Sequence, residues 1–279
     1  SMGSDVVDIN NDGLQDVVEV DMLPQDNYRK KMFQPPGSYQ TYQNIEFYGY
    51  QYQYPRNMLH LNMGKMPGEN DNVTHPVFAD IGFYANVAET DWSWCPLVAD
   101  FDSDGMKDII FTNGFPRDIT DRDFMAYRKD AKMLASTKDM LESIPEVKIH
   151  NYAYRNAGNA TFEDVSYQWG LGAAGFSNGA AYADLDNDGD LDMVINNIND
   201  PAGIYENRMK GNNYLRRKIT GAEKNINAIG AKVIIYQKDK TQYYDNNLFR
   251  GYLSTQSFII HAGVGPDMTI DSVIVIWPD

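Results

Sequence analysis

The sequence predicts an all-β protein: a partial β-propeller with a helical insertion, followed by a small β-sandwich-like domain. One acidic pattern, D-x-[DN]-x-D-G-x-x-D, occurs three times, starting at Asp8, Asp100 and Asp184. Short apolar runs flank each copy, which is typical of a β-hairpin with the acidic loop at its tip. Two copies also follow a second pair of strand-like runs. A repeated unit of about four strands is the signature of a propeller blade.

The three acidic segments, called loops 1, 2 and 3 below, have the composition of cation sites. Side chains at positions 1, 3, 5 and 9 and the carbonyl at position 7 can converge on one ion, and the glycine at position 6 permits the tight turn. All-oxygen donors suit Ca²⁺ first, and Mg²⁺ or Mn²⁺ after it. The alternative is three acidic turns without an ion, but the threefold spacing favours metal. We therefore expect up to three calcium ions, held by Asp8, Asn10, Asp12, Leu14 and Asp16; by Asp100, Asp102, Asp104, Met106 and Asp108; and by Asp184, Asp186, Asp188, Asp190 and Asp192.

Loop 1 also satisfies the EF-hand pattern, because Glu19 stands at its twelfth position. Loops 2 and 3 have Phe111 and Ile195 at that position, so neither has the bidentate glutamate that closes an EF-hand. The flanking runs are also strand-like and not helical. The EF-hand interpretation is therefore rejected.

The blade unit is read from the segments before loops 2 and 3. Residues 57–64 and 77–81 precede loop 2 and predict two strands joined by an Asn-x-Gly turn, and residues 152–158 and 161–165 repeat this before loop 3. We group each such pair with the acidic hairpin that follows it. The loops lie farther apart than the usual blade period of about 40 to 50 residues. The sequence therefore predicts insertions at about 22–55 and 118–148.

The second insertion carries a helical pattern. Thr120 is the predicted N-cap, with Asp123 three residues later, and Pro145 ends the pattern. The apolar residues expected to pack on the blades are Phe124, Tyr127, Ala131, Leu134 and Leu141.

The first insertion is rich in tyrosine. Tyr48, Tyr50, Tyr52 and Tyr54 alternate with glycine and glutamine, which predicts a strand with four rings on one face. Such a face could stack on a sugar or form a protein interface, since tyrosine combines apolar area with a polar tip. Ordinary packing within a sheet remains the alternative. These four tyrosines are the candidate ligand-binding residues.

Composition excludes several classes of function. A net charge of −15 over 279 residues argues against nucleic acid as a partner. The chain has one cysteine, Cys95, which lies in an apolar run and is predicted to be a buried free thiol. No apolar run is long enough to predict a transmembrane segment. The four histidines are scattered and no nucleophile has an evident partner, so we expect no enzyme.

The C-terminal residues 212–279 predict a small all-β domain, because the apolar runs 233–236, 258–260 and 273–277 are separated by turn residues. Their sequence suggests no ligand. At the other end, only seven residues precede Asp8, so the chain opens inside a blade. We therefore expect a piece of a longer protein, the alternative being a complete small protein with a degenerate first blade.

Two parts of the chain resemble known families. Residues 1–207 resemble the calcium-binding FG-GAP or VCBS repeats of integrin-like propellers in their acidic loops and Asn-x-Gly hairpins. Residues 212–279 resemble the ASPIC/UnbV domain of the cartilage-acidic-protein-like family, and Asp21–Pro24 and Trp92–Trp94 are similar to versions from Bacteroidetes-type bacteria. The resemblance implies an exported protein, at the cell surface, associated with the outer membrane or extracellular. The segments that carry the ASPIC/UnbV resemblance are 227–233, 251–256, 263–265 and 277–278.

These observations together predict an exported calcium-binding propeller module for binding or adhesion, with a glycan or protein ligand and structural calcium. Two alternatives stay open: a carbohydrate-active enzyme that uses a propeller cleft, and a scaffold component of a surface nutrient-uptake assembly.

Overall fold

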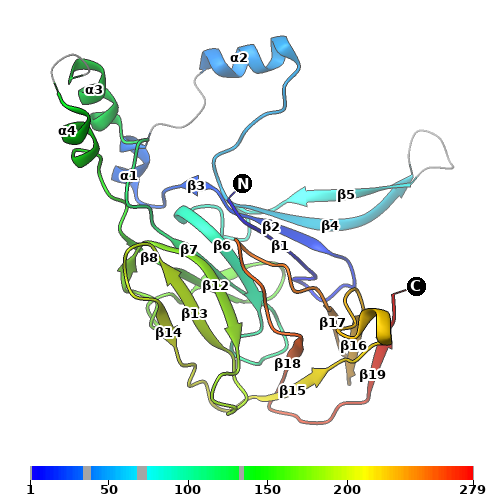
Figure 1. Ribbon diagram of the computed structural model, residues 1–279. Helices are drawn as coiled ribbons and strands as arrows, with labels where there is room; N and C mark the ends of the chain where they lie inside the picture. Colours follow the sequence, from blue (N-terminus) through cyan, green and yellow to red (C-terminus); the bar gives the residue numbers. More distant parts are fainter. Residues whose placement is uncertain (1, 34–38, 68–73, 132–134, 279) are drawn as a thin grey trace.

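The computed structural model describes residues 2–33, 39–67, 74–131 and 135–278 (Figure 1). The described chain is mostly β, as predicted, and its first part consists of three twisted antiparallel sheets, called blades 1, 2 and 3. Blade 1 has the order β1-β2-β4-β5, blade 2 the order β10-β9-β7-β6-β3, and blade 3 the order β12-β13-β14. Two short strands, β8 (Ile149–His150) and β11 (Ala174–Gly175), pair between blades 2 and 3. The strands of the blades are β1 (Ser4–Val7), β2 (Asp16–Glu19), β4 (Met58–Pro67) and β5 (Thr74–Asp80); β3 (Met22–Leu23), β6 (Asp91–Ala99), β7 (Asp108–Asn113), β9 (Tyr152–Asn156) and β10 (Phe162–Asp164); and β12 (Ser177–Ala183), β13 (Asp192–Asn197) and β14 (Gly203–Tyr205).

The predicted acidic hairpins are confirmed, but their grouping into blades is corrected. Each loop joins two antiparallel strands: β1 and β2, β6 and β7, or β12 and β13. The Asn-x-Gly hairpin extends the acidic hairpin before it in the chain, because Val18 of β2 pairs with Leu59 of β4 and Ile109 of β7 pairs with Tyr154 of β9. The alternation of apolar and polar residues identifies the strands but not which strands pair, because pairing depends on how their side chains pack in the folded protein.

Blade packing creates two hydrophobic cores. Alternate residues of a strand face opposite sides of its sheet, so Val98 and Ile109 pack toward blade 1 while Leu97 and Ile110 pack toward blade 3. All four side chains are buried. Blade 2 therefore packs against both of its neighbours, and this stacking fixes the relative positions of the three acidic loops.

The helices lie at the end of the blades away from the C-terminal domain (Figure 1). The single predicted helix over 120–145 is two helices, α3 (Arg122–Ala131) and α4 (Thr137–Glu142). The N-cap of α3 is Asp121 and not Thr120, because the Asp121 carboxylate accepts the Phe124 N–H at 2.9 Å. Ser136 begins α4 with a capping box.

The expected packing face of this insertion is largely wrong. Phe124 is buried, whereas Tyr127 and Leu141 are exposed. Leu134 lies outside the described residues. The helices therefore project from the blades and do not lie flat on them.

The tyrosine-rich strand predicted in the first insertion is also wrong. This insertion contains α1 (Asn27–Met32) and α2 (Tyr39–Tyr48), and residues 49–57 form no strand. Gly49 has φ +68°, its N–H donates to the Glu46 carbonyl, and the Tyr50 N–H donates to Ile45. These bonds form a Schellman motif, which needs a glycine in the left-handed region to end a helix. The period-two pattern thus spans a helix end and an extended segment.

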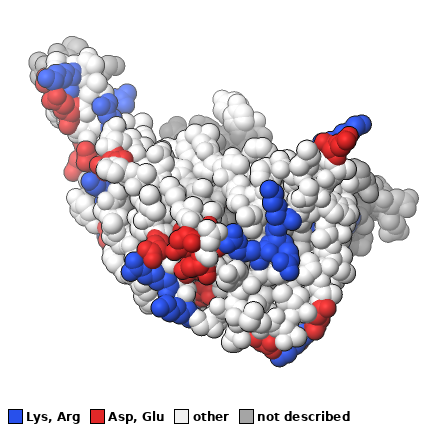
Figure 2. All heavy atoms as spheres, turned by 60° about the horizontal axis from the view of Figure 1, so that its bottom comes forward, with Lys and Arg blue, Asp and Glu red and all other residues white. Residues whose placement is uncertain are grey.

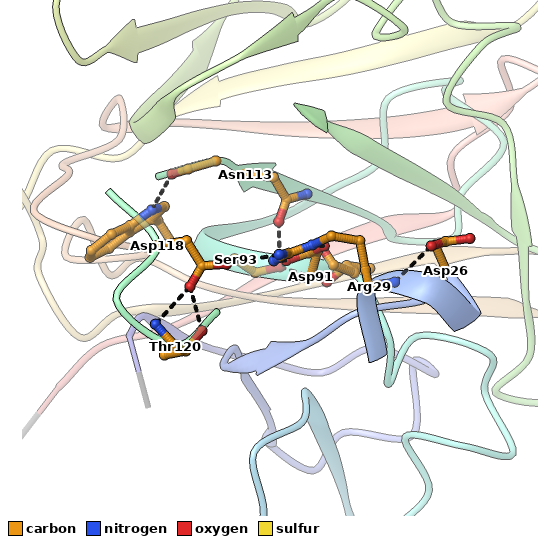
Figure 3. Close-up of polar contacts among 10 residues, drawn as sticks. Asp26, Arg29, Asp91, Ser93, Asn113, Asp118 and Thr120 are labelled. Atoms are coloured by element: carbon orange, nitrogen blue, oxygen red, sulfur yellow. Dashed lines mark hydrogen bonds and ion pairs between the residues drawn. The ribbon is translucent and has the colours of Figure 1, made fainter. Parts of the chain in front are cut away.

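Arg29 of α1 connects both insertions to blade 2 (Figure 3). Its guanidinium donates to both oxygens of Asp91 at 2.9 and 3.0 Å and to Asp118 at 2.8 Å. Asp118 also accepts the Thr120 N–H at 2.9 Å, and Ser93 donates to Asn113 nearby at 2.6 Å. The Asp118 side chain is fully buried, so its charge depends on Arg29.

The C-terminal domain is a small sandwich, as predicted. Its sheets have the orders β15-β18 and β17-β16-β19, and they enclose a core that includes Val233, Ile235 and Ile260. Its elements are β15 (Asn213–Lys218), η1 (Glu223–Asn225), β16 (Lys232–Gln237), β17 (Lys240–Asp245), β18 (Ile259–Gly265) and β19 (Ser272–Ile276).

A segment of this domain, residues 250–256, contacts the first strand of each acidic hairpin. Gly251 N–H donates to the Ser4 carbonyl of β1 at 3.0 Å, and Tyr252 N–H donates to Cys95 Sγ of β6 at 3.3 Å. Gln256 accepts the Tyr182 N–H of β12 at 3.0 Å. Arg250 also forms an ion pair with the buried Asp5 of β1 at 2.9 Å. One segment therefore joins the three blades.

Replacing Arg29 with alanine should destabilise the protein by about 3 kcal/mol, because it leaves the buried Asp91 and Asp118 carboxylates without their cation. Urea unfolding measures the change. The control is Lys138→Ala, whose ion pair with Glu142 is exposed on both sides and should contribute less than about 0.5 kcal/mol. Equal effects of the two variants would contradict this role of Arg29.

Candidate metal centres at the blade hairpins

The three loops share one backbone conformation. In each, positions 4 and 6 have positive φ, a region that asparagine and glycine adopt more easily than other residues. Position 6 is glycine in all three loops, with φ between 86° and 103°. The pattern in the sequence therefore reflects one geometry used three times. The residues are Asn11, Ser103 and Asn187 at position 4 and Gly13, Gly105 and Gly189 at position 6.

Backbone donors hold the first and last carboxylates of a loop in place. In loop 2, Asp100 accepts the N–H groups of Asp104 and Gly105 at 3.1 and 2.9 Å, and Asp108 accepts the Phe101 N–H at 2.9 Å. Loop 1 repeats these bonds at Asp8 and Asp16. In loop 3 the corresponding last carboxylate, Asp192, accepts the Leu185 N–H.

Three of the five predicted ligands lie close together in each of two loops. Oxygen atoms of Asp100, Asp102 and Asp108 lie within 4.8 Å of one another, and all three residues are buried. Asp184, Asp186 and Asp188 form the same kind of group in loop 3, with more exposure. Loop 1 has the Asn10 amide in place of one carboxylate, and its carboxylates do not form such a group among the described residues.

The fifth and seventh positions are also connected. The position 5 carboxylate accepts the position 7 N–H in every loop, at 2.7 to 3.2 Å. The predicted ligands at position 7 are therefore next to the site, and their backbone carbonyls remain the expected donors. These pairs are Asp12 with Leu14, Asp104 with Met106, and Asp188 with Asp190.

Burial makes the negative charge of these loops costly. It raises the pKa of Asp100 to about 7, with the Asp104 carboxylate adding to the rise. Burial also raises the pKa of Asp108 well above its ordinary value and the pKa of Asp16 to about 6. A divalent cation among these oxygens would offset the desolvation and the mutual repulsion.

Loop 3 carries direct signs of an oxygen donor without a partner. The Asp184 side chain is 3% exposed, and its Oδ1 atom accepts no hydrogen bond. The Asp190 Oδ1 atom is likewise buried without a partner. An orphaned buried carboxylate oxygen is expensive unless it binds a proton or a metal. These oxygens and the all-oxygen donor set fit Ca²⁺.

After each acidic hairpin, an asparagine forms a hydrogen bond that holds the position 9 carboxylate in place. Sequence analysis did not recognise this role for any of the three asparagines. The backbone N–H of the asparagine donates to the position 9 aspartate at 2.8 to 2.9 Å, and its side-chain amide donates to the position 8 carbonyl. Two of these residues had been assigned only to turns. The three are Asn62 to Asp16, Asn156 to Asp108, and Asn207 to Asp192.

The same asparagines connect successive loops. The Asn156 amide also donates to the Ile9 carbonyl of loop 1 at 3.3 Å, and the Asn207 amide donates to the Phe101 carbonyl of loop 2 at 2.8 Å. The sequence signal was the recurrence of asparagine two residues before a turn, which continues at Asn207 without the glycine. Loops 1 and 2 are therefore each held partly by the blade that follows them.

A buried lysine lies between loops 1 and 2. The Lys107 ammonium donates to the Asn11 side chain at 2.8 Å and lies 4.8 Å from the centre of the Tyr244 ring. Burial lowers its pKa to about 8, while the nearby Asp8 and Asp100 oppose the shift. Lys107 therefore offsets part of the negative charge of both loops.

The four predicted tyrosines are exposed, so packing in a sheet core is excluded. Their exposed fractions are 64% for Tyr48, 70% for Tyr50, 41% for Tyr52 and 50% for Tyr54. Tyr42, which the pattern missed, stacks on Tyr52 with ring centres 5.0 Å apart. The insertion thus presents a cluster of aromatic rings at the surface.

Cys95 is buried and free, as predicted. Burial raises the pKa of its thiol, which disfavours the reactive thiolate. Among the described residues, the helices are too short and too polar to cross a membrane.

Comparisons with known proteins agree with the motifs. The family described as ASPIC and UnbV matches residues 221–279, and the FG-GAP-like repeat family matches residues 146–195, which include loop 3. Human (Homo sapiens) cartilage acidic protein 1 is 25% identical over 189 residues, covering 66% of this chain and 24% of the human protein. The Mus musculus and Xenopus tropicalis proteins of that name are 26% and 27% identical over 217 residues, covering 65% of this chain and 33% of theirs. The chain thus spans about a quarter to a third of the length of these relatives.

The metal-free protein should lose stability between about pH 4 and 7 through Asp100. Its folded-state pKa of about 7 exceeds the ordinary value of 3.8, so the native state binds more protons than the unfolded chain in this range. The free energy of unfolding then falls as the pH rises, and the contribution is complete only below the unfolded pKa.

Thermal melts in chelator at several pH values measure this effect for the wild type and for Asp100→Asn. The wild type should lose more stability with rising pH than the variant, and calcium should reduce that difference. Parallel pH profiles of the two metal-free proteins would contradict the assignment.

Proposed function

We propose that this chain, a member of the cartilage-acidic-protein-like family with an FG-GAP-like repeat and an ASPIC and UnbV domain, is an exported propeller module that binds calcium in its hairpin loops and attaches to a glycan or protein ligand. The two domains themselves indicate a propeller-like protein-binding or adhesion module. Calcium, export and the ligand class are the proposed parts.

The orphaned Oδ1 atom of Asp184 is the observation that best supports calcium. A buried carboxylate oxygen that accepts no hydrogen bond, on a residue grouped with two further carboxylates, has the surroundings of a metal ligand. The role of the ion is structural. It would pair with the loop charges and hold each hairpin closed, while the Asn62, Asn156 and Asn207 bonds orient the last ligand of each loop.

Chelation should therefore lower the melting temperature. An ion that binds only the native state stabilises it by about 2.7 kcal/mol per site at a hundredfold excess over Kd. Asp188→Ala should remove much of the sensitivity that arises at loop 3, whereas Asp239→Ala, in an exposed turn of the C-terminal domain, should leave it unchanged. Metal analysis of the purified protein should find up to three calcium ions. An unchanged melt in excess chelator would refute structural calcium.

The exposed aromatic cluster supports a ligand-binding role for the first insertion. Tyr48 and Tyr50 have ring centres 6.2 Å apart, and Tyr52 and Tyr54 have ring centres 6.4 Å apart. Exposed rings with little other packing can stack on a sugar face or anchor a protein contact. The cluster also lies on an insertion and not on the repeated blades, where loops on a rigid scaffold commonly carry function.

Tyr50→Ala and Tyr52→Ala should each weaken ligand binding without changing the calcium-dependent melt. A glycan array and a panel of candidate protein ligands provide the binding readout. Tyr84→Ala is the matched control, because Tyr84 is 66% exposed and lies outside the cluster. Binding that both cluster variants leave intact would refute this site.

The same glycan panel separates the remaining functions. Binding without turnover supports the module proposed here. Hydrolysis or elimination of a glycan would support a carbohydrate-active enzyme, and the absence of both would support a scaffold component of a surface nutrient-uptake assembly.

A further inference from the structure

The C-terminal domain contacts all three acidic loops. Its strands β15, β17 and β18 lie at the end of the blades where the loops are (Figure 1). Figure 2 brings this end forward and shows acidic side chains gathered in one patch, with basic side chains beside them. Sequence analysis found no ligand for this domain, but the structure shows that it contacts the candidate metal centres themselves.

Several of these contacts are at loop 2. Gly263 of β18 donates its N–H to Asp100 Oδ2 at 3.0 Å, and Gly265 donates to the Ser103 carbonyl at 2.9 Å. The Asn212 amide donates to the Asp102 carbonyl at 2.8 Å. A Cβ atom at position 263 would overlap both Asp100 Oδ2 and the Ser103 backbone, so only glycine fits against the loop in this shape.

Loop 3 makes equivalent contacts with β15 and β18. The Arg216 guanidinium forms an ion pair with Asp184 Oδ2, whereas the buried Oδ1 has no hydrogen-bond partner. His261 Nε2 lies 2.8 Å from the Gly189 carbonyl. The Tyr214 ring occupies the space where a Cβ of Gly189 would be.

Loop 1 is contacted by β17. The Tyr243 ring lies against Gly13, and the Gln15 amide donates to the Asp245 carboxylate. Asp100 Oδ2 accepts the N–H groups of both Gly105 in loop 2 and Gly263 in the C-terminal domain, and Asp184 of loop 3 pairs with Arg216. The first-position aspartates of loops 2 and 3 are thus shared with the C-terminal domain. These contacts are between protein groups, so they do not depend on which ion binds.

We propose that cation binding in the acidic loops and docking of the C-terminal domain are thermodynamically coupled, each favouring the other, with Gly263 on Asp100 as the principal contact. The coupling rests on the proposed binding of calcium. Without an ion, the buried carboxylates of loop 2 repel one another and favour an opened loop. An opened loop displaces the Asp100 and Ser103 acceptors, on which β18 packs with no space for even a methyl group.

A bound ion holds the carboxylates inward and so keeps these acceptors in place. Reciprocity then requires the docked domain to raise the affinity of the loops for the ion by the same factor. Arg216 does not replace the ion at loop 3, because it engages only one oxygen of Asp184.

Hydrogen exchange of the full chain tests the coupling. Removing calcium should speed exchange at 259–265 and 240–245, which contact the loops, well before it speeds exchange at 232–237 in the middle strand of the second sheet. Trypsin should also cut faster after Arg208 and Lys210, in the connection that Asn207 and Asn212 fix to loops 3 and 2.

A matched pair of glycine variants measures the reciprocal effect. Gly263→Ala should lower calcium affinity at one site at least fivefold by titration calorimetry, within the usual range of coupling between sites. Gly175→Ala should not, because its Cβ would meet only ordinary contacts at 3.5 Å in β11, which pairs with β8 and not with the C-terminal domain. Should Gly263→Ala fail to fold, Asn212→Ala removes one docking bond without a clash and should lower the affinity in the same direction.

The outcomes separate the two proposals. If the wild type binds no calcium, the proposed metal function fails and the coupling fails with it. If calcium binds but its removal leaves exchange at 259–265 unchanged, and the affinities of Gly263→Ala and Asn212→Ala equal that of the wild type, only the coupling is overturned.

Discussion

The negative charge buried at the hairpin tips is the constraint on which the rest of this structure depends. Asp100 and Asp108 are almost fully buried within a few ångströms of Asp102, an arrangement that costs free energy unless every oxygen has a partner. Backbone N–H groups, including that of Asn156, and the charge of Lys107 each meet part of this demand. The partners come from three blades and the C-terminal domain, so local charge compensation also fixes the tertiary arrangement.

The two ends of the blades have different physical characters. At the loop end, carboxylates, asparagines and the C-terminal domain form a continuous polar network, and residues 250–256 join the inner strands β1, β6 and β12. At the other end, a partly buried arginine, Arg29, connects two insertions whose helices otherwise project outward. The end with the acidic loops is crosslinked by polar contacts, and the opposite end exposes aromatic rings. This division suits a module whose ions maintain its shape while a separate surface binds a ligand.

Sequence analysis succeeded where the information was local. The acidic loops follow from fixed spacing and from a glycine that the turn requires, and the buried Cys95 follows from its apolar neighbours. It failed where tertiary contacts decide. The predicted grouping of strands into blades was wrong because the alternation of apolar and polar residues does not determine which strands pair. The predicted tyrosine strand was wrong because Gly49 ends a helix within the tyrosine pattern. Two contacts join distant parts of the chain: the ion pair of Arg216 with Asp184 and the hydrogen bond from Gly263 to Asp100. No sequence pattern in one of these segments indicates that it contacts the other.

Gly263 illustrates how far a motif can be interpreted without the fold. In the sequence, Gly263-Val264-Gly265 is a short segment that carries a family resemblance and suggests a turn. In the structure only Gly265 has positive φ, at 67°, while Gly263 lies within β18, where any residue's backbone would fit. Gly263 is required because Asp100 and Ser103 occupy the space of a side chain. The two positions therefore require glycine for different reasons. Gly265 is needed for its own positive φ, whereas Gly263 is needed because loop 2, more than half the chain away in sequence, leaves no space for a side chain.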